Sequence, residues 1–244
     1  MRNVRLDICY DGSKYKGWQR LSNTDNTIQC KLETALSRIL DEPIEVVGSG
    51  RTDAGTHAKM QVVNFHCNSA MACDAILSQL RRYLPEDIGI YSCRNVSERF
   101  HARLNAKTKT YVYRLWNSDM PCVFNRKYVY KECLQLDVSR MRRAAEHFLG
   151  THDFSAFCAN KNMKKSTVRC IHAFTIEEVE GELRFAVTGN GFLHHMVRIM
   201  VGTLLEVGKG EREPDTIAEL FGQDRSEAGI LVPACGLCLM EVTY

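Results

Sequence analysis

The order of apolar and polar residues predicts an alternation of strands and helices in the first half of the chain. Alternating apolar positions predict strands, and apolar residues three and four apart predict helices. Asn26 or Thr27 is a suitable cap for the first helix, which Pro43 would end. The predicted elements, in order, are strand 4–10, helix 28–40, strand 44–47, strand 61–66, helix 76–84 and strand 88–96. This β-α-β-β-α-β order is typical of ferredoxin-like domains.

The same order recurs in the second half without close repetition of the sequence. The predicted elements are strand 110–116, a short extended piece 127–130, a helix capped by Asp137 and closed by Gly150, a hairpin of 168–178 with 183–188, a helix over 193–204, a shorter helix over 216–221 and strand 237–243. We therefore expect an α+β protein of two related halves, each with a sheet backed by helices. The basic stretch 97–109 marks the junction, so the expected domains are 1–104, carrying the catalytic loop, and 105–244, completing the site.

The segment from Gly48 to His57 is the strongest candidate for a site in the first half. It lies between two predicted strands, and its three glycines allow a tight turn and the close approach of a flat substrate. Arg51 and Asp53 lie between the glycines. The guanidinium of Arg51 can bind an anion, and the carboxylate of Asp53 can act as an acid, a base or a nucleophile. A plain connecting turn with a structural Arg–Asp pair is the alternative interpretation.

Two further candidates lie in the second half. Tyr111 directly follows Lys109-Thr110 at the start of a predicted strand. The alternative interpretation is that Tyr111 is an ordinary aromatic residue of the core. Arg198 interrupts the apolar face of the predicted helix over 193–204, which follows the glycine-flanked turn Gly189–Gly191. A guanidinium facing a core needs a carboxylate, and Asp53 is one candidate partner.

Composition narrows the function classes. The 244 residues are 45% hydrophobic and 25% charged, with a formal net charge of only +3, so any RNA-binding surface must come from local clusters of basic residues. The candidates for phosphate contacts are Lys14, Lys16, Arg20, Arg99, Arg103, Lys164, Lys165 and Arg169. Eleven scattered cysteines without a signal peptide favour a cytoplasmic protein with reduced thiols, and no apolar run is long enough for a membrane span.

A metal site is not expected from the sequence. The single CxxC, Cys235 to Cys238, has no matching second pair, so a zinc site there is disfavoured. His194 and His195 are adjacent on a predicted helix, where neighbouring side chains point about 100° apart and do not readily share an ion.

Taken together, several short motifs resemble those of the TruA-type tRNA pseudouridine synthases. The first is the loop Gly50-Arg51-Thr52-Asp53-Ala54-Gly55 with His57. The others follow in the same order over nearly the whole chain: Tyr10-Asp11-Gly12 with Gly17-Trp18-Gln19, Arg99 to Arg103, Lys109 to Tyr113, Asp153 to Phe157, Phe192 to Arg198 with Val201-Gly202, and Gly236-Leu237.

The resemblance implies a pseudouridine synthase fold, a homodimer that binds tRNA, and no cofactor or metal. It implies isomerisation of uridine to pseudouridine, at positions 38–40 of the tRNA anticodon stem-loop. Asp53 would be the nucleophile, Tyr111 would stack on the uracil, Arg51 would help displace the base and Arg198 would pair with Asp53. Gly50 and Thr52 are expected to contact the substrate beside them.

Other interpretations remain open at this point. Thr56, Cys238 and the spacing of basic residues in 161–166 depart from the family pattern, so a paralogue that modifies another RNA, such as ribosomal RNA, would fit as well. A non-catalytic RNA-binding protein would use the same basic clusters. A dimeric aspartic protease would use Asp53-Ala54-Gly55, but it predicts an all-β chain and gives Arg51 and Tyr111 no role.

Overall fold

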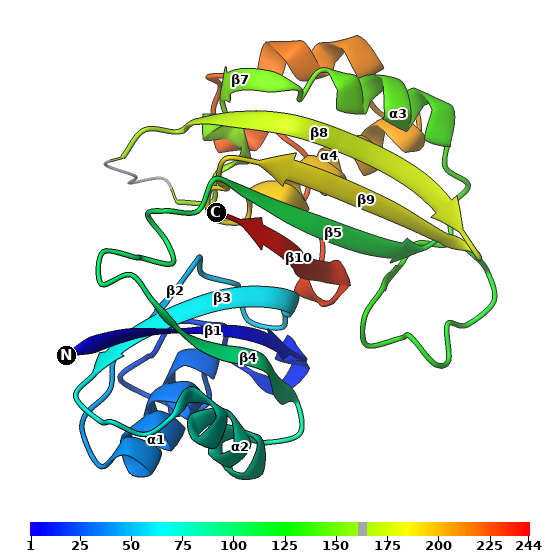
Figure 1. The fold of residues 1–244 in the computed structure, drawn as a ribbon. Coiled ribbons are helices and arrows are strands. Elements are labelled where there is room, and N and C mark those ends of the chain that lie inside the picture. The colour runs from blue at the N-terminus through cyan, green and yellow to red at the C-terminus, as the bar shows by residue number, and fades with distance from the viewer. Residues whose placement is uncertain (161–164) are drawn as a thin grey trace. The chain divides into compact units, whose positions relative to one another are not determined.

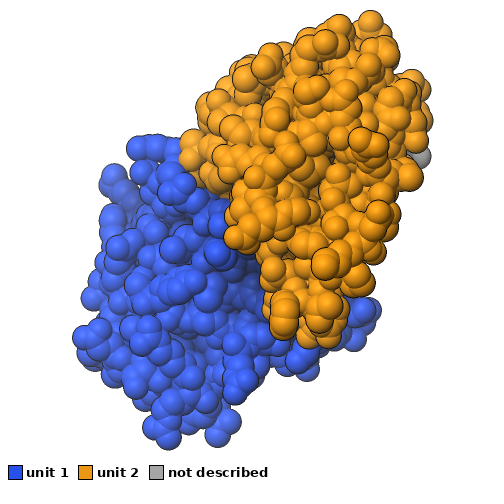
Figure 2. All heavy atoms as spheres, turned by 90° about the vertical axis from the view of Figure 1, so that its right-hand side faces the viewer, with its two compact units in different colours: residues 1–107, 238–244 blue, residues 108–237 orange. Residues whose placement is uncertain are grey.

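The computed structural model describes residues 1–160 and 165–244 and has the expected mixed α+β architecture (Figure 1). The chain forms two compact units, distinguished by colour in Figure 2. Unit 1 comprises Met1–Lys107 and Cys238–Tyr244, and unit 2 comprises Thr108–Leu237. Each unit contains strands and helices of its own, so the prediction of an α+β fold is confirmed.

Unit 1 contains a sheet in the strand order β4-β1-β3-β10, with β2 paired to β3. Helices α1 and α2 pack beside each other on one side of it (Figure 1). The elements are β1 (Arg2–Tyr10), α1 (Ile28–Leu40), β2 (Val46–Gly48), β3 (His57–Cys67), α2 (Cys73–Tyr83), β4 (Ile88–Val96) and β10 (Leu237–Thr243). The first six follow the predicted β-α-β-β-α-β order. Strand β1 is antiparallel to both β3 and β4.

The ends of α1 show how local sequence sets its length. Thr27 is the N-cap, and its side-chain oxygen accepts a hydrogen bond from the Cys30 N–H, which satisfies a donor that the first turn would leave unpaired. Asp41 at the other end adopts a left-handed conformation, which stops the helix two residues before Pro43. The buried face carries Ile28, Leu32, Leu36 and Ile39, the apolar positions from which the helix is predicted.

Unit 2 contains four neighbouring strands in the order β5-β9-β8-β7, with β6 paired to β5. Helices α3 and α4 pack against each other, with α3 also contacting β8 and α4 contacting β5 (Figure 1). The elements are β5 (Thr108–Trp116), β6 (Tyr130–Lys131), α3 (Val138–Glu146), β7 (Gly150–Asp153), β8 (Val168–Val179), β9 (Glu182–Gly189) and α4 (Met196–Gly208). Helix α4 is apolar nearly all round and almost wholly buried, which makes it the central helix of this core.

Several elements differ from the sequence expectation. The last strand, β10, pairs in parallel with β3, so residues 238–244 belong to unit 1 although the expected second domain ran to 244. Strand β7 follows Gly150 where no strand is predicted. The short helix expected at 216–221 is a 3-10 helix over Pro214–Leu220. These features depend on pairing partners far away in the sequence, which local periodicity does not reveal.

Candidate active site

The loop 49–56 connects β2 to β3 and carries Asp53. Ser49, Thr52 and Thr56 are buried, whereas Asp53 is half-buried and Arg51 is exposed. The Thr56 N–H donates to the Asp53 carbonyl at 3.1 Å, which closes a turn around Ala54 and Gly55. The loop therefore presents Asp53 and Arg51 on a backbone that is fixed on both sides.

Buried hydrogen bonds hold the first part of this loop. Gln61, fully buried on β3, donates from Nε2 to the Gly50 carbonyl at 2.9 Å and accepts a hydrogen bond from the Ser49 hydroxyl. A buried amide that satisfies both a backbone carbonyl and a side-chain hydroxyl orders the groups that it joins. Gln61 thus ties the beginning of the loop to the strand that follows it.

Tyr10 holds the residue next to Asp53. Its hydroxyl and the Thr52 Oγ1 share a buried hydrogen bond of 2.8 Å. Burial raises the pKa of Tyr10 well above its usual value, so the phenol stays neutral and able to donate. The Thr52 carbonyl in turn accepts from the Trp18 N–H at 3.0 Å. Thr52 is fixed through its side chain and its backbone, and it is buried rather than open to a substrate.

His57 fastens the end of the loop. Its Nδ1 accepts a hydrogen bond from the Gly12 N–H at 3.1 Å and lies 3.1 Å from a carboxylate oxygen of Asp11. A Cβ on Gly12 would lie 2.0 Å from the Thr56 carbonyl oxygen, so only glycine allows the turn after β1 to approach the loop this closely. The sequence alone gives His57 no chemical role, and this contact explains why the loop motif and the Tyr10-Asp11-Gly12 motif occur together.

In unit 2, Tyr111 lies on β5 opposite Val187 of β9. Tyr111, Tyr113 and Leu115 are all buried, which confirms that these alternate residues share one face. The Tyr111 ring packs edge-on against Phe192, with centroids 5.2 Å apart. Part of the Tyr111 ring is therefore fixed by the turn that leads into α4.

Arg198 lies in the first turn of α4 and is half-buried. Its Nε donates to the Val232 carbonyl at 2.8 Å. The next carbonyl, that of Pro233, accepts from the Tyr113 hydroxyl at 2.8 Å. One short segment therefore anchors both the arginine of α4 and the strand that carries Tyr111, which sets the direction of the Arg198 side chain within unit 2.

His194 and His195 do not lie on the helix as expected from the sequence. Helix α4 begins at Met196, and His195 is its N-cap in a left-handed conformation with φ of 65°. The two imidazole rings lie next to each other, with centroids 3.7 Å apart and their planes tilted by 31°. The argument from adjacent positions on a helix is wrong, because these residues precede the helix.

The basic residues named from the sequence fall into two groups. Lys14, Lys16, Arg99, Arg103 and Lys165 are exposed, as expected for phosphate contacts. Arg20 pairs with the buried Glu33 at 3.0 Å, and the Arg169 Nη1 donates to the carbonyls of Ser166 and Val168. Those two guanidiniums therefore have structural partners as well. Lys164 lies outside the described residues.

The supporting residues were the part that sequence reasoning missed. Gln61 is a polar side chain in the apolar strand β3, and that misfit is the signal that marks it as a buried hydrogen-bonding group. Tyr10 belongs to a motif that resembles the family, but nothing local shows that its hydroxyl reaches Thr52, 42 positions away.

Comparison of the sequence with known families finds one match. The family model described as tRNA pseudouridine synthase matches residues 8–105 and 144–244, more than half of the chain. Both the Asp53 loop and the Arg198 helix lie within the matched residues.

Curated relatives match over the full length of both chains. The chain is 46% identical over 245 residues to tRNA pseudouridine synthase A of Bacillus sp. (strain KSM-64) and 47% identical to tRNA pseudouridine synthase A 1 of Clostridium tetani. It is 43% identical to tRNA pseudouridine synthase A 2 of Bacillus cereus (strain ZK / E33L). In each case all of this chain and all of the relative are covered.

Among the described residues, no helix combines the length and the apolar character needed to cross a bilayer. The helices of both units also disagree with the all-β chain that a small aspartic protease requires. Identity of this extent and the matching family model point to the same family that the sequence motifs resemble. The chain belongs to the tRNA pseudouridine synthase family of the TruA type, whose members are isomerases that convert uridine to pseudouridine.

Proposed function

We propose that this protein isomerises uridine to pseudouridine in tRNA, at positions 38–40 of the anticodon stem-loop, with Asp53 as the nucleophile. The observation that carries the proposal is the Asp53 loop, in which buried side chains fix the backbone on both sides of a half-buried carboxylate. A nucleophile held in place in this way needs no rearrangement before it reacts.

The reaction rearranges bonds within the target uridine, and the protein must expose the base and hold it while this happens. The N1–C1′ bond breaks, the uracil turns, and C5 bonds to C1′ while the C5 hydrogen leaves as a proton and N1 gains one. The carboxylate of Asp53 forms a transient covalent adduct with the target nucleoside, and that adduct keeps the base in the site while it turns. The protein also has to take the base out of its stack, at a cost of a few kcal/mol.

The other residues follow from these requirements. Arg51, exposed on the loop, helps to displace the base. Stacking of the uracil on the ring of Tyr111 recovers part of the energy lost when the base leaves its stack. Arg198 pairs with Asp53, because an opposite charge favours the ionised carboxylate. Gly50 brings the backbone close to the substrate, and the buried Thr52 acts by holding the loop. The exposed basic residues bind the phosphate backbone.

The test separates chemistry from binding. Wild type should release tritium from tRNA that carries 5-tritiated uridine, whereas Asp53→Ala should bind the tRNA with similar affinity and release none. Asp74→Ala, which removes an exposed acid on α2, is the matched control and should behave as wild type. Tritium release by Asp53→Ala would show that another group is the nucleophile. If wild type released none from tRNA but released it from ribosomal RNA, the substrate assignment would be wrong.

We also propose that the protein acts in the cytoplasm as a homodimer, as the resemblance implies. The family relationship supports this proposal. Light scattering of the purified protein should give a mass of about twice 27.8 kDa. A mass of 27.8 kDa at micromolar concentration would contradict the dimer.

A further inference from the structure

A small hollow opens beside the Asp53 loop, entirely within unit 1. It has a volume of about 130 Å³, and the residues that form it include Trp18, Gln29, Val47, Gly48, Arg51 and Arg103. The buried indole of Trp18 lies directly against the strand backbone, since a Cβ on Gly48 would lie 2.5 Å from the Trp18 Cζ2. The hollow therefore has a rigid aromatic wall, and two arginines take part in its lining.

The polar side of the hollow is equally well fixed. The Gln29 side-chain oxygen accepts from the Gln19 amide at 2.8 Å and from the Arg20 N–H at 3.0 Å. Its amide nitrogen donates to the buried Glu33 at 2.9 Å. Glu33 also accepts from the Val46 N–H at 3.1 Å, so this network ties α1 to β2. A hollow whose lining is held by such a network keeps its shape without a ligand.

Arg103 stands on a turn that is held from three directions. The His101 Nδ1 accepts the N–H groups of both Arg103 and Leu104 at 3.2 Å. The neighbouring Ala102 donates its N–H to the buried Asn64 at 2.8 Å, and its carbonyl accepts from the Tyr244 hydroxyl at 2.7 Å. The backbone beneath this exposed arginine is therefore rigid, although its side chain is open to solvent.

The charge of the hollow is positive. Within residues 1–160 and 165–244, neither Arg51 nor Arg103 has a carboxylate at ion-pair distance. The nearby Glu33 carboxylate is already paired with Arg20. Guanidinium groups without an internal partner, mounted on fixed backbone, suit the bidentate recognition of a phosphate.

The size indicates what fits beside that phosphate. A cavity of about 150 Å³ accepts a single benzene ring, so 130 Å³ corresponds to about one six-membered ring. We propose that the hollow is a second nucleotide subsite, in which the base next to the target uridine is inserted and Arg103 binds its phosphate. This proposal rests on the proposed function and adds to it a position at which the enzyme contacts the sequence flanking its target.

The target uridine itself is not the expected occupant. Asp53 does not line the hollow, whereas Arg51, two residues before it, does. A nucleotide in the hollow would therefore lie beside the nucleophile rather than on it. That is the position expected for the nucleotide next to a flipped target base. Enzymes that flip bases commonly select their substrates through such flanking nucleotides.

The test couples one arginine to one phosphate. The substrates are anticodon stem-loop RNAs in which the phosphate on the 5′ or the 3′ side of the target uridine is a neutral methylphosphonate. On unmodified RNA, Arg103→Ala should lower kcat/KM about tenfold. On one of the two modified RNAs, kcat/KM of wild type should also fall about tenfold. On that RNA the kcat/KM of Arg103→Ala should be no lower than that of wild type, because the contact between Arg103 and the phosphate is already absent. Additive losses at both phosphates, or no loss in the variant, would overturn the proposal.

A second variant tests the base rather than the phosphate. Val47→Phe places a ring in the hollow without changing any charge, and thermal unfolding checks that the protein still folds. We expect kcat/KM to fall about tenfold, and unchanged activity would show that no base enters the hollow. Arg82→Ala, which removes an exposed charge on α2, is the matched control. An inactive wild type would instead contradict the proposed function, whereas an active wild type without coupling would contradict the subsite alone.

Discussion

The two units hold their proposed site residues in different ways. In unit 1, Asp53 lies on a loop, and hydrogen bonds that involve the side chains of Tyr10, Gln61 and His57 fix that loop. In unit 2, Tyr111 lies on a paired strand and Arg198 on a buried helix, so sheet pairing and packing hold them. A loop has no repeating hydrogen bonds of its own and needs dedicated side chains to fix it, whereas strands and helices do not.

This difference predicts different consequences of mutation. Removing a supporting hydroxyl in unit 1 should change the rate of the chemical step with little effect on folding, because each hydrogen bond contributes little to stability but sets the position of the loop. Removing a supporting group of the unit 2 sheet should lower stability and leave the chemistry of the folded protein unchanged. Three predictions test the comparison, beginning with the largest effect.

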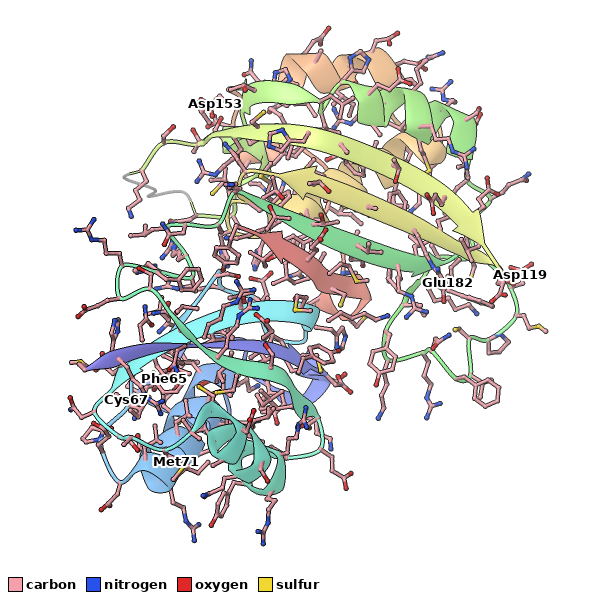
Figure 3. The ribbon with its side chains drawn as sticks, viewed as in Figure 1. Phe65, Cys67, Met71, Asp119, Asp153 and Glu182 are labelled. Atoms are coloured by element: carbon pink, nitrogen blue, oxygen red, sulfur yellow. The ribbon has the colours of Figure 1, made fainter. Side chains whose placement is uncertain are left out.

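Glu182 is a buried charged residue on the strands of unit 2. It lies at the start of β9 (Figure 3) and is 4% exposed. Its carboxylate pairs with Arg114 of β5, whose Nε donates at 2.8 Å, and with Arg184 at 3.2 Å. Glu182→Gln leaves both guanidiniums without their counter-charge, and we expect it to lower the free energy of unfolding by about 3 kcal/mol. Urea unfolding measures this loss, and kcat of the folded variant should stay unchanged.

The effect of Glu182 should also depend on pH. Burial raises the pKa of its carboxyl, but the hydrogen bonds and charges of Arg114 and Arg184 outweigh burial, so the pKa is lowered. Its stabilisation is therefore complete above the unfolded-state value of about 4.3 and is lost as the pH falls below it. The advantage of wild type over Glu182→Gln should shrink from pH 6 towards pH 3. Glu178→Gln, which breaks an exposed pair with Arg142, is the control and should cost less than about 1 kcal/mol at either pH.

Arg198 tests whether a packed residue of unit 2 takes part in the chemistry. Arg198→Ala should lower kcat about 100-fold, the usual effect of removing one electrostatic contact from a reaction centre. Arg198→Lys should lose less activity, because lysine keeps the positive charge. It should still lose some, because lysine lacks the Nε that donates to the Val232 carbonyl. Single-turnover kinetics on tRNA measure both rates. Equal activity of wild type and the two variants would refute the pairing of Arg198 with Asp53.

Tyr10 tests the prediction that removing a supporting hydroxyl in unit 1 slows the chemical step but has little effect on stability. Tyr10→Phe removes only the hydroxyl that shares a hydrogen bond with Thr52, so we expect about a tenfold fall in kcat and a loss of only about 1 kcal/mol in stability. KM for tRNA should not change, because the loop still presents the same groups. The effects of Tyr10→Phe and Thr52→Val should not add, since both remove the same bond. Tyr83→Phe on α2, whose ring is half exposed, is the matched control. A higher KM with unchanged kcat would show that Tyr10 does not position the nucleophile.

Much of this framework can be predicted from the sequence, because it depends on local patterns. The cap at Thr27, the shared face of Tyr111 and Tyr113, and the position of the Asp53 loop between two strands all follow from spacing and residue type. The motifs by themselves also indicate the family, since they occur in order along nearly the whole chain.

The remaining features depend on contacts between distant segments. The parallel pairing of β10 with β3 and the hydrogen bond from Tyr10 to Thr52 join residues that nothing local connects. The left-handed conformation of His195 moves the start of α4 past both histidines, although a positive φ is uncommon for residues other than glycine. The surrounding structure overrides local preference at such positions.

The central claim is that Asp53 converts uridine to pseudouridine in tRNA. The most direct measurement maps pseudouridines in tRNA by chemical adduct formation and primer extension, after incubation with wild type or with Asp53→Asn, which keeps the shape of the side chain. We predict new stops at positions 38–40 with wild type and none with Asp53→Asn. The same stops with Asp53→Asn, or none with wild type, would contradict the claim.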